Sequence, residues 1–237
     1  MASDAKTVKI GDIEYTLATD EKFEEFRQFA TGDDGWEEVY TDDAKQTHVY
    51  RKKAGSSSVN MFKLTRPMED IKPETLYDVL HDHNYRKVWD ENMLSGIVIE
   101  QMNKTNEVGY YAAKSPGPIS NRDFVNQRCW RALPDKGEWL IINWSVKHHE
   151  YPEQKGFVRA ISILSGYYIT KHSSGGTFFT YVTQTDPKGW IPSWVVNSVT
   201  GKFAPRVADT LHEVAQKYPE WKKENQPEWR PWLDEKE

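Results

Sequence analysis

The spacing of hydrophobic and polar positions divides the chain into helical and strand-like stretches. Phe23, Phe26 and Ala30 recur at helical spacing, so residues 20–30 are predicted to form a first helix with Asp20 at its capped start. Three short strand-like stretches follow, at 36–40, 47–51 and 58–64, with a turn signal at 55–57 between the last two.

A second helix is predicted from Pro73 to Met93, because proline suits the first helical turn and Leu76 and Leu80 form an apolar side. Strand-like stretches then follow one another at 97–102, 107–114, 123–132, 138–147, 157–169 and 177–185. Turns that contain glycine or proline separate them. Consecutive strands without helices between them are typical of an antiparallel meander.

The last pattern is a long helical stripe. Its apolar residues lie three or four positions apart between Ser193 and Tyr218: Val196, Val199, Phe203, Val207, Leu211, Val214 and Tyr218. The Pro- and Trp-rich tail 219–237 is not expected to form a regular helix. We therefore predict an α+β fold in which a curved antiparallel sheet wraps around one long C-terminal helix, with a polar segment 1–19, a domain 20–218 and the tail. Such a sheet encloses a concave interior, which favours a ligand pocket.

Composition narrows the classes of function. The 237 residues carry 31 Lys and Arg against 36 Asp and Glu, a formal net charge of −5 that disfavours a nucleic-acid partner. The 10 Trp, 12 Tyr and 9 Phe concentrate the apolar area of a polar chain in large rings. No apolar run reaches the length of a membrane span, and no signal-peptide pattern follows Met1. With Cys129 as the only cysteine, we expect a soluble cytoplasmic protein.

The sequence contains no recognised motif for catalysis, nucleotide binding or metal binding. His81-Asp82-His83 resembles a metal-ligand cluster, but positions i and i+2 of a helix point to different sides, so we interpret these residues as surface residues. His148-His149-Glu150 is interpreted as a solvated turn, and Cys129 as an inert core thiol. We therefore expect no catalytic residue, no metal and no cofactor.

Three segments, taken in order, resemble one known family. They are residues 85–90 (YRKVWD), 116–125 (PGPISNRDFV) and 186–197 (DPKGWIPSWVVN). Together they are similar to a START domain, the StAR-related lipid-transfer fold, and within that family to the phosphatidylcholine transfer protein subgroup. The tail segments 218–222 (YPEWK) and 231–233 (PWL) fit the same subgroup, so the resemblance covers about residues 20 to 233.

The resemblance implies a helix-grip fold whose tunnel holds one lipid, and it assigns the lipid head group to particular residues. Arg86 takes the position of the arginine that meets the lipid phosphate, and Asp90 lies near the same head group. A buried phosphodiester needs a paired cation, and arginine supplies a fork of donors that stays charged. Without the resemblance, an exposed i,i+4 ion pair is the alternative interpretation of these two residues.

The same resemblance places Tyr111 and Phe124 as rings around choline, which is bound by the faces of aromatic rings because it has no hydrogen to donate. Ordinary cross-strand packing is the alternative interpretation of this pair. The third ring of the family pattern falls at Ile163, which is not aromatic, and Tyr167 or Tyr168 could replace it. This departure predicts a looser site that also admits ethanolamine.

Two further regions are assigned roles in lipid binding and membrane contact. The stripe residues Val199, Phe203, Val207 and Leu211 are predicted to line the wall of the tunnel, although ordinary core residues would show the same pattern. Trp190 and Ile191, in a loop before the last helix, are predicted to contact the membrane and to open with that helix as a lid, because tryptophan prefers the head-group level of a bilayer. A packed loop tryptophan is the alternative.

The sequence thus predicts a cytoplasmic, peripherally membrane-associated monomer that carries one phosphatidylcholine or phosphatidylethanolamine between membranes without covalent chemistry. The alternatives are a START-type carrier of a sterol or carotenoid, and a lipid thioesterase, for which no nucleophile–base pair is evident.

Overall fold

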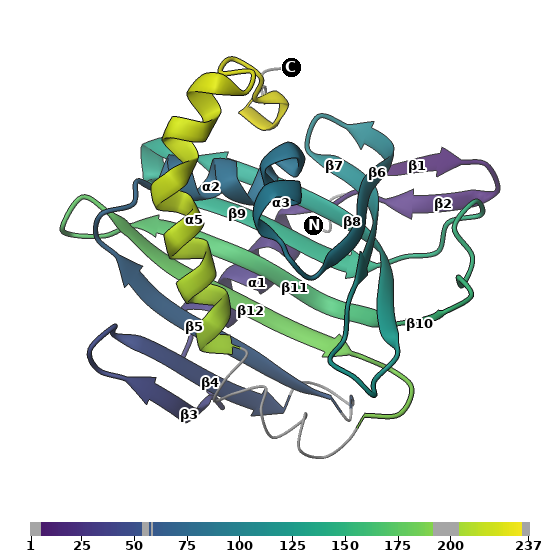
Figure 1. Cartoon of the computed structure of the whole chain (residues 1–237), viewed down its shortest axis with the longest axis horizontal. Coiled ribbons are helices and arrows are strands. Elements are labelled where there is room, and N and C mark those ends of the chain that lie inside the picture. Colours follow the sequence, from purple (N-terminus) through teal and green to yellow (C-terminus); the bar gives the residue numbers. More distant parts are fainter. Residues whose placement is uncertain (1–5, 54–56, 58, 192–203, 234–237) are drawn as a thin grey trace.

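The computed structural model describes residues 6–53, 57, 59–191 and 204–233, and one large curved sheet dominates it (Figure 1). The strands are β1 Thr7–Ile10, β2 Ile13–Thr16, β3 Glu37–Asp42, β4 Thr47–Lys53, β5 Asn60–Met68, β6 Met93–Asn103, β7 Asn106–Ala113, β8 Asn121–Leu133, β9 Glu138–Ser145, β10 Phe157–Arg159, β11 Ile161–Lys171 and β12 Thr177–Asp186. The helices are α1 Asp20–Thr31, α2 Pro73–His81, α3 His83–Trp89 and α5 Ala204–Glu224, with short 3-10 turns η1 Pro134–Lys136 and η3 Pro231–Leu233.

The large sheet confirms the predicted meander. Its strand order is β3-β4-β5-β12-β11-β9-β8-β7-β6, and neighbours along this path are antiparallel. The predicted strand 157–169 is instead two strands, because β10 pairs in parallel with β8 while β11 pairs with β9 and β12. At the change of partner, the amide of Ala160 donates to the carbonyl of Asp123. A separate hairpin, β1–β2, precedes the sheet.

Both faces of the sheet are covered, and strand alternation determines which side chains face which helix. Ile141 packs in the cluster formed with α2 and α5, whereas Leu140 and Ile142 pack against Phe23 and Phe26 of α1. Figure 1 shows α2, α3 and α5 in front of the sheet and α1 behind it. Within the described ranges, no helix is long and apolar enough to cross a bilayer.

The predicted helix from Pro73 to Met93 is two helices, because the chain breaks at Asp82. One carboxylate oxygen of Asp82 accepts from the amides of Asn84 and Tyr85, which caps α3. The other oxygen accepts from Lys222 of α5 at 2.8 Å. The break therefore joins the start of α3 to the far end of the C-terminal helix.

The interpretations of the two histidine motifs were wrong for their buried members, whereas His149 and Glu150 are exposed as predicted. His81 and Asp82 are 2% and 1% exposed, so they are core residues rather than surface residues. His148 is 5% exposed and stacks on His149, with ring centroids 4.7 Å apart, so this turn is not fully solvated. Cys129 is buried as predicted.

The C-terminal helix continues past its predicted end. α5 runs through Pro219 to Glu224, although an internal proline costs a helix about 3 kcal/mol. Contacts made beyond the proline offset this cost. Trp221 packs on Tyr85 with ring centroids 4.7 Å apart, and Lys222 is 3% exposed in its ion pair with Asp82.

Candidate functional site

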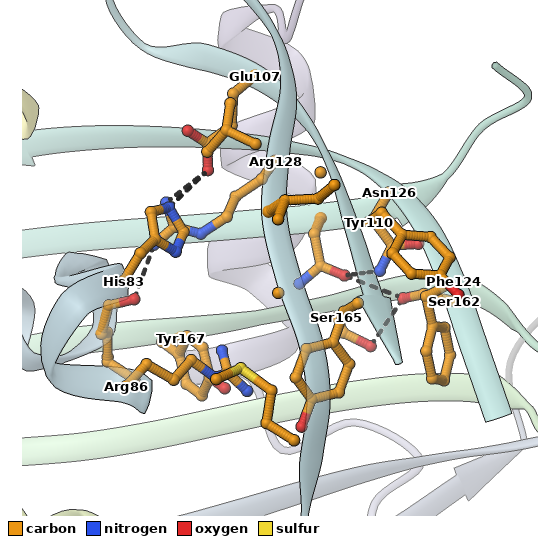
Figure 2. A pocket seen from close by; sticks show the side chains of 18 of the residues that line it. His83, Arg86, Glu107, Tyr110, Phe124, Asn126, Arg128, Ser162, Ser165 and Tyr167 are labelled. Atoms are coloured by element: carbon orange, nitrogen blue, oxygen red, sulfur yellow. Dashed lines mark hydrogen bonds and ion pairs between the residues drawn. The ribbon is translucent and has the colours of Figure 1, made fainter. Parts of the chain in front are cut away.

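A cavity of about 230 Å³ lies between α3, the β6–β7 hairpin and the sheet (Figure 2). Its lining includes the rings of Tyr110, Tyr111, Phe124, Tyr167 and Tyr181, the ionisable side chains His83, Arg86, Glu107 and Arg128, and the small polar residues Asn126, Asn143, Ser162, Ser165 and Thr185. Three of the four residues predicted for the head group, Arg86, Tyr111 and Phe124, therefore lie in one cavity. The fourth, Asp90, contacts two of them.

Arg86 and Asp90 form the predicted i,i+4 pair, and Tyr111 completes it. Nε of Arg86 donates to Oδ2 of Asp90 at 3.0 Å, and the Tyr111 hydroxyl donates to the same oxygen at 2.9 Å. The Arg86 guanidinium also lies 4.8 Å from the centre of the Tyr111 ring. The Arg86 side chain keeps 34% of its surface accessible, because it faces the cavity, whereas that of Asp90 keeps 9%. Arg86 therefore presents an oriented positive charge to the cavity, and the more buried carboxylate of Asp90 pairs with it.

The charge state of this group follows from its surroundings. Burial alone would lower the pKa of Arg86, but Tyr111, Tyr167 and Asp90 together raise it, so the guanidinium stays charged. Burial raises the pKa of Tyr111 to about 12, with Asp90 adding to the rise and Arg86 opposing it. The phenol therefore stays protonated and can donate to Asp90 at neutral pH.

The predicted aromatic pair is present, and the structure distinguishes the candidates for a third ring. Tyr111 on β7 is directly opposite Phe124 on β8, with ring centroids 6.5 Å apart. Tyr167 lines the same cavity, whereas Tyr168 points to the other face of β11 and packs in the cluster with α1. Ile163 lies at an irregularity of β11, is 39% exposed and is absent from the cavity lining.

Sequence reasoning did not identify Tyr181, although it extends the aromatic wall. Tyr181 on β12 pairs directly with Tyr167, and the two rings stack 5.0 Å apart. Burial raises the pKa of both phenols, so both remain neutral. The alternation of β12 places Phe179, Tyr181 and Thr183 on one face, and this period-two signal could have indicated the position.

A second charged group was also missed. Arg128 donates to Glu107 at 3.2 Å and to the carbonyl of Leu80 at 3.0 Å, and His83 lies 3.6 Å from Glu107. Burial alone would raise the pKa of Glu107, but His83 and Arg128 lower it overall. Strand alternation again supplies the signal, because Glu107 shares a strand face with Tyr111, and Arg128 shares one with Phe124.

The predicted tunnel wall is only partly described. Val207 is half-buried and Leu211 is buried, and both pack into the core between α5 and the sheet rather than against the cavity described above. Val199 and Phe203 lie outside the described residues. The role of these four side chains as a lipid wall stays a prediction.

The predicted membrane loop lies at the end of β12. Trp190 is 67% exposed, and Ile191 is half-buried. Arg122 on β8 holds the loop backbone: its guanidinium donates to the carbonyls of Pro187 at 3.1 Å and Lys188 at 2.7 Å. The loop thus presents its tryptophan outward from a fixed base, and its contact with a membrane stays a prediction.

The residue types for metal or thiol chemistry are not arranged for it in the described part of the chain. There, no group of three or more His, Cys, Asp or Glu side chains is placed to hold a metal ion. The Cys129 thiol donates to Asn106 at 2.8 Å, and burial raises its pKa to about 12. A thiol held in that state is not a nucleophile at neutral pH.

Comparisons with known proteins place this geometry in a family. A family model described as the START domain matches residues 16–221. The chain belongs to the START family. START domain-containing protein 10 of Mus musculus is 39% identical over 216 residues, which cover 90% of this chain and 72% of that protein. Phosphatidylcholine transfer protein of Bos taurus is 28% identical over 172 residues, which cover 72% of this chain and 80% of that protein.

A solved structure supports the fold of this START domain. The crystal structure of human STARD10 aligns with a TM-score of 0.84 at 36% identity, over 92% of this chain and 87% of that one. The helix-grip START fold predicted from the sequence is therefore confirmed.

Proposed function

We propose that this START domain carries one phosphatidylcholine or phosphatidylethanolamine at a time between membranes, with the lipid head group in the cavity beside α3. The observation that carries the proposal is the Arg86–Asp90 pair, whose arginine faces the cavity. The family membership and the named relative, a phosphatidylcholine transfer protein, support it.

The charges of the pair match those of a zwitterionic head group. Arg86 offers the cavity a forked cation whose remaining N–H donors suit a phosphodiester, and Asp90 supplies the balancing negative charge. A sterol or carotenoid has no anionic group for such a fork, so the pair favours a phospholipid over those alternatives.

The aromatic walls suit the other end of the head group. Tyr111 and Phe124 lie on one side and Tyr167 and Tyr181 on the other. A quaternary ammonium is attracted to ring faces by about 0.5–2 kcal/mol per ring. The third ring is supplied by Tyr167, because position 163 carries isoleucine. We expect this altered arrangement of rings to accept more than one ammonium head group.

Exchange of the lipid requires contact with a bilayer, and we assign that contact to the loop around Trp190. An exposed indole on a loop that Arg122 holds in place suits insertion at the head-group level. Transfer then needs no covalent step and no cofactor, and a single copy of the chain is sufficient for it.

Replacement of Arg86 by leucine tests the proposal. The Arg86→Leu variant is expected to lower the transfer of phosphatidylcholine between liposomes by about 10- to 100-fold, because a hydrogen bond to a charged group contributes about 1.5–3 kcal/mol. The matched control is Arg51→Leu, which removes an arginine of the distant strand β4 that is paired with Glu37 of β3, and it is expected to leave transfer unchanged.

Native mass spectrometry of the unmodified protein after mixing with liposomes gives the second readout. We expect one bound phospholipid per chain, lost in Arg86→Leu. A wild-type protein that holds no phospholipid, or that holds a sterol in its place, would contradict the proposal.

A further inference from the structure

A band of small polar side chains crosses the floor of the cavity. It consists of Asn126, Asn143, Ser162, Ser165, Thr183 and Thr185, here called the polar stripe, and all but Thr183 line the cavity. The register of the sheet produces it: Asn143 is directly opposite Ser165, and Ser165 is opposite Thr183. The stripe therefore runs across neighbouring strands, between the Tyr111–Phe124 pair and the Tyr167–Tyr181 pair.

The members of the polar stripe are hydrogen bonded to one another. Asn143 Oδ1 accepts from Asn126 Nδ2 at 3.3 Å and from Ser162 Oγ at 3.2 Å. Ser162 Oγ is also 3.0 Å from Ser165 Oγ (Figure 2). The chain of hydroxyls continues through Thr183, 2.8 Å from Ser165, and through Thr185, 3.1 Å from Thr183.

A chain of this kind has acceptor capacity to spare. Each hydroxyl has a single proton to donate but can accept more than one hydrogen bond, so linked hydroxyls consume donors faster than acceptors. Asp90 and Glu107 add negative charge beside the cavity, although each is paired with an arginine. The hydroxyl oxygens of the polar stripe therefore suit a ligand group that carries several N–H donors.

Acyl chains do not require a polar floor, because an apolar floor would bind them without the cost of desolvating polar groups. Choline does not use hydrogen-bond acceptors, because its methylated nitrogen has no proton to donate. The primary ammonium of ethanolamine does donate, and its buried N–H groups need acceptors. The chemistry of the floor thus matches one of the two head groups better than the other.

We propose that the polar stripe determines the selectivity of this protein for phosphatidylethanolamine: it accepts hydrogen bonds from the primary ammonium, while the flanking rings serve choline. This inference rests on the proposed function and names the residues that distinguish phosphatidylethanolamine from phosphatidylcholine. Ser162 and Ser165, which are 4% and 6% exposed, are the central members of the site.

The test is a competition between the two lipids. Protein is mixed with liposomes that contain equal amounts of phosphatidylcholine, phosphatidylethanolamine and cholesterol, and the bound lipid is identified by native mass spectrometry. The double variant Ser162→Ala/Ser165→Ala is expected to lower the ratio of bound phosphatidylethanolamine to phosphatidylcholine by about tenfold while phosphatidylcholine binding is retained. Restoring one hydroxyl as Ser162→Ala/Ser165→Thr is expected to recover part of the ratio.

Thr180→Ala is the matched control. Thr180 is 2% exposed on the opposite face of β12, so its loss removes a buried hydroxyl without touching the cavity. We expect its ratio of bound lipids to equal that of the unmodified protein. If the double variant does not fold, Thr185→Val removes a hydroxyl of the stripe at nearly constant volume, with a fall of about threefold expected.

The outcomes separate this inference from the proposed function. An unchanged ratio in folded stripe variants, or equal loss of both phospholipids, would overturn the role of the stripe while leaving the carrier intact. Failure of the unmodified protein to bind either phospholipid, or its selection of cholesterol, would overturn both.

Discussion

At the scale of single residues, Gly166 on β11 shows how closely the floor of the site is packed. It lies between Ser165 and Tyr167, whose side chains face the cavity, so a side chain at 166 would point to the opposite face. A Cβ placed there would lie 2.3 Å from the carbonyl oxygen of Ile141 and 2.8 Å from the Phe26 ring. Real atoms do not approach so closely, and a strand carbonyl cannot move aside without breaking its ladder.

We therefore expect Gly166→Ala to lower the free energy of unfolding by about 3 kcal/mol or more, at the upper end of overpacked substitutions. Urea unfolding, monitored by tryptophan fluorescence, measures this change in the free energy of unfolding. Gly117→Ala is the control, because no atom lies within 4 Å of its added Cβ, and its change is expected to stay within about 0.5 kcal/mol. Similar values for the two variants would contradict the packing argument.

Residue-scale prediction from the sequence succeeded where the relevant contact is local. The Arg86–Asp90 pair follows from i,i+4 spacing on one helix, and the structure contains it. The hydroxyl of Tyr111 on Asp90 could not be predicted in this way, because it joins α3 to β7 through tertiary packing. His81 was misjudged for the same reason, since its burial comes from Trp130 and Trp232, which are distant in sequence.

At the scale of elements, the segment 187–191 after β12 combines an anchored backbone with an exposed ring. Arg122 anchors its carbonyls from β8, and Trp190 leaves 67% of its surface exposed. Under the proposed function, this anchored segment offers its tryptophan to the membrane surface. Its contribution can therefore be measured separately from lipid binding inside the cavity.

Trp190→Ala is expected to weaken co-sedimentation with liposomes and to slow lipid transfer by about three- to tenfold, because burial of a large ring contributes about 1.5–3 kcal/mol and a loop ring inserts only in part. The lipid already bound should remain. Phe178→Ala serves as control: this ring is 37% exposed at the opposite end of β12. Equal effects of both variants would argue against a specific role for the loop.

The boundaries of helices and strands were predicted well where the local sequence pattern determines them. They were predicted poorly where contacts with residues distant in sequence determine them. The strand alternation of β7, β8 and β12 located these strands to within two residues. At the break, Asp82 pairs with Lys222, which lies beyond Pro219 on α5, so both misjudged boundaries involve one long-range ion pair. A pattern along one segment carries no information about a partner so far away in the sequence.

At the scale of the whole molecule, folding constrains the protonation of a central histidine. Nδ1 of His81 is 3.1 Å from the Arg128 guanidinium and so acts as an acceptor. Burial, with Arg128 and His83, holds the pKa of His81 well below its usual value of about 6.5. The unfolded chain therefore binds a proton below about pH 6.5 that the folded chain does not.

Stability should consequently fall as the pH decreases below about 6.5, by up to about 1.4 kcal/mol per pH unit for one such group. His148, whose pKa burial also lowers, acts in the same direction. Urea unfolding between pH 7.5 and pH 5 measures the slope. His81→Gln keeps an acceptor for Arg128 and should flatten it, whereas His172→Gln, in an exposed turn, should not. An identical slope in all three proteins would rule out His81 as its source.

The division of β11 and β12 into two faces has an evolutionary consequence. On each strand, the residues that pack under α1 alternate with those that face the cavity, so one backbone holds the packed core on one side and the proposed head-group cavity on the other. Substitutions among the cavity-facing positions can accumulate while the opposite face preserves the packing that keeps the sheet folded. A duplicated copy of such a gene can therefore change the lining of its cavity in small steps, each of which leaves the fold intact.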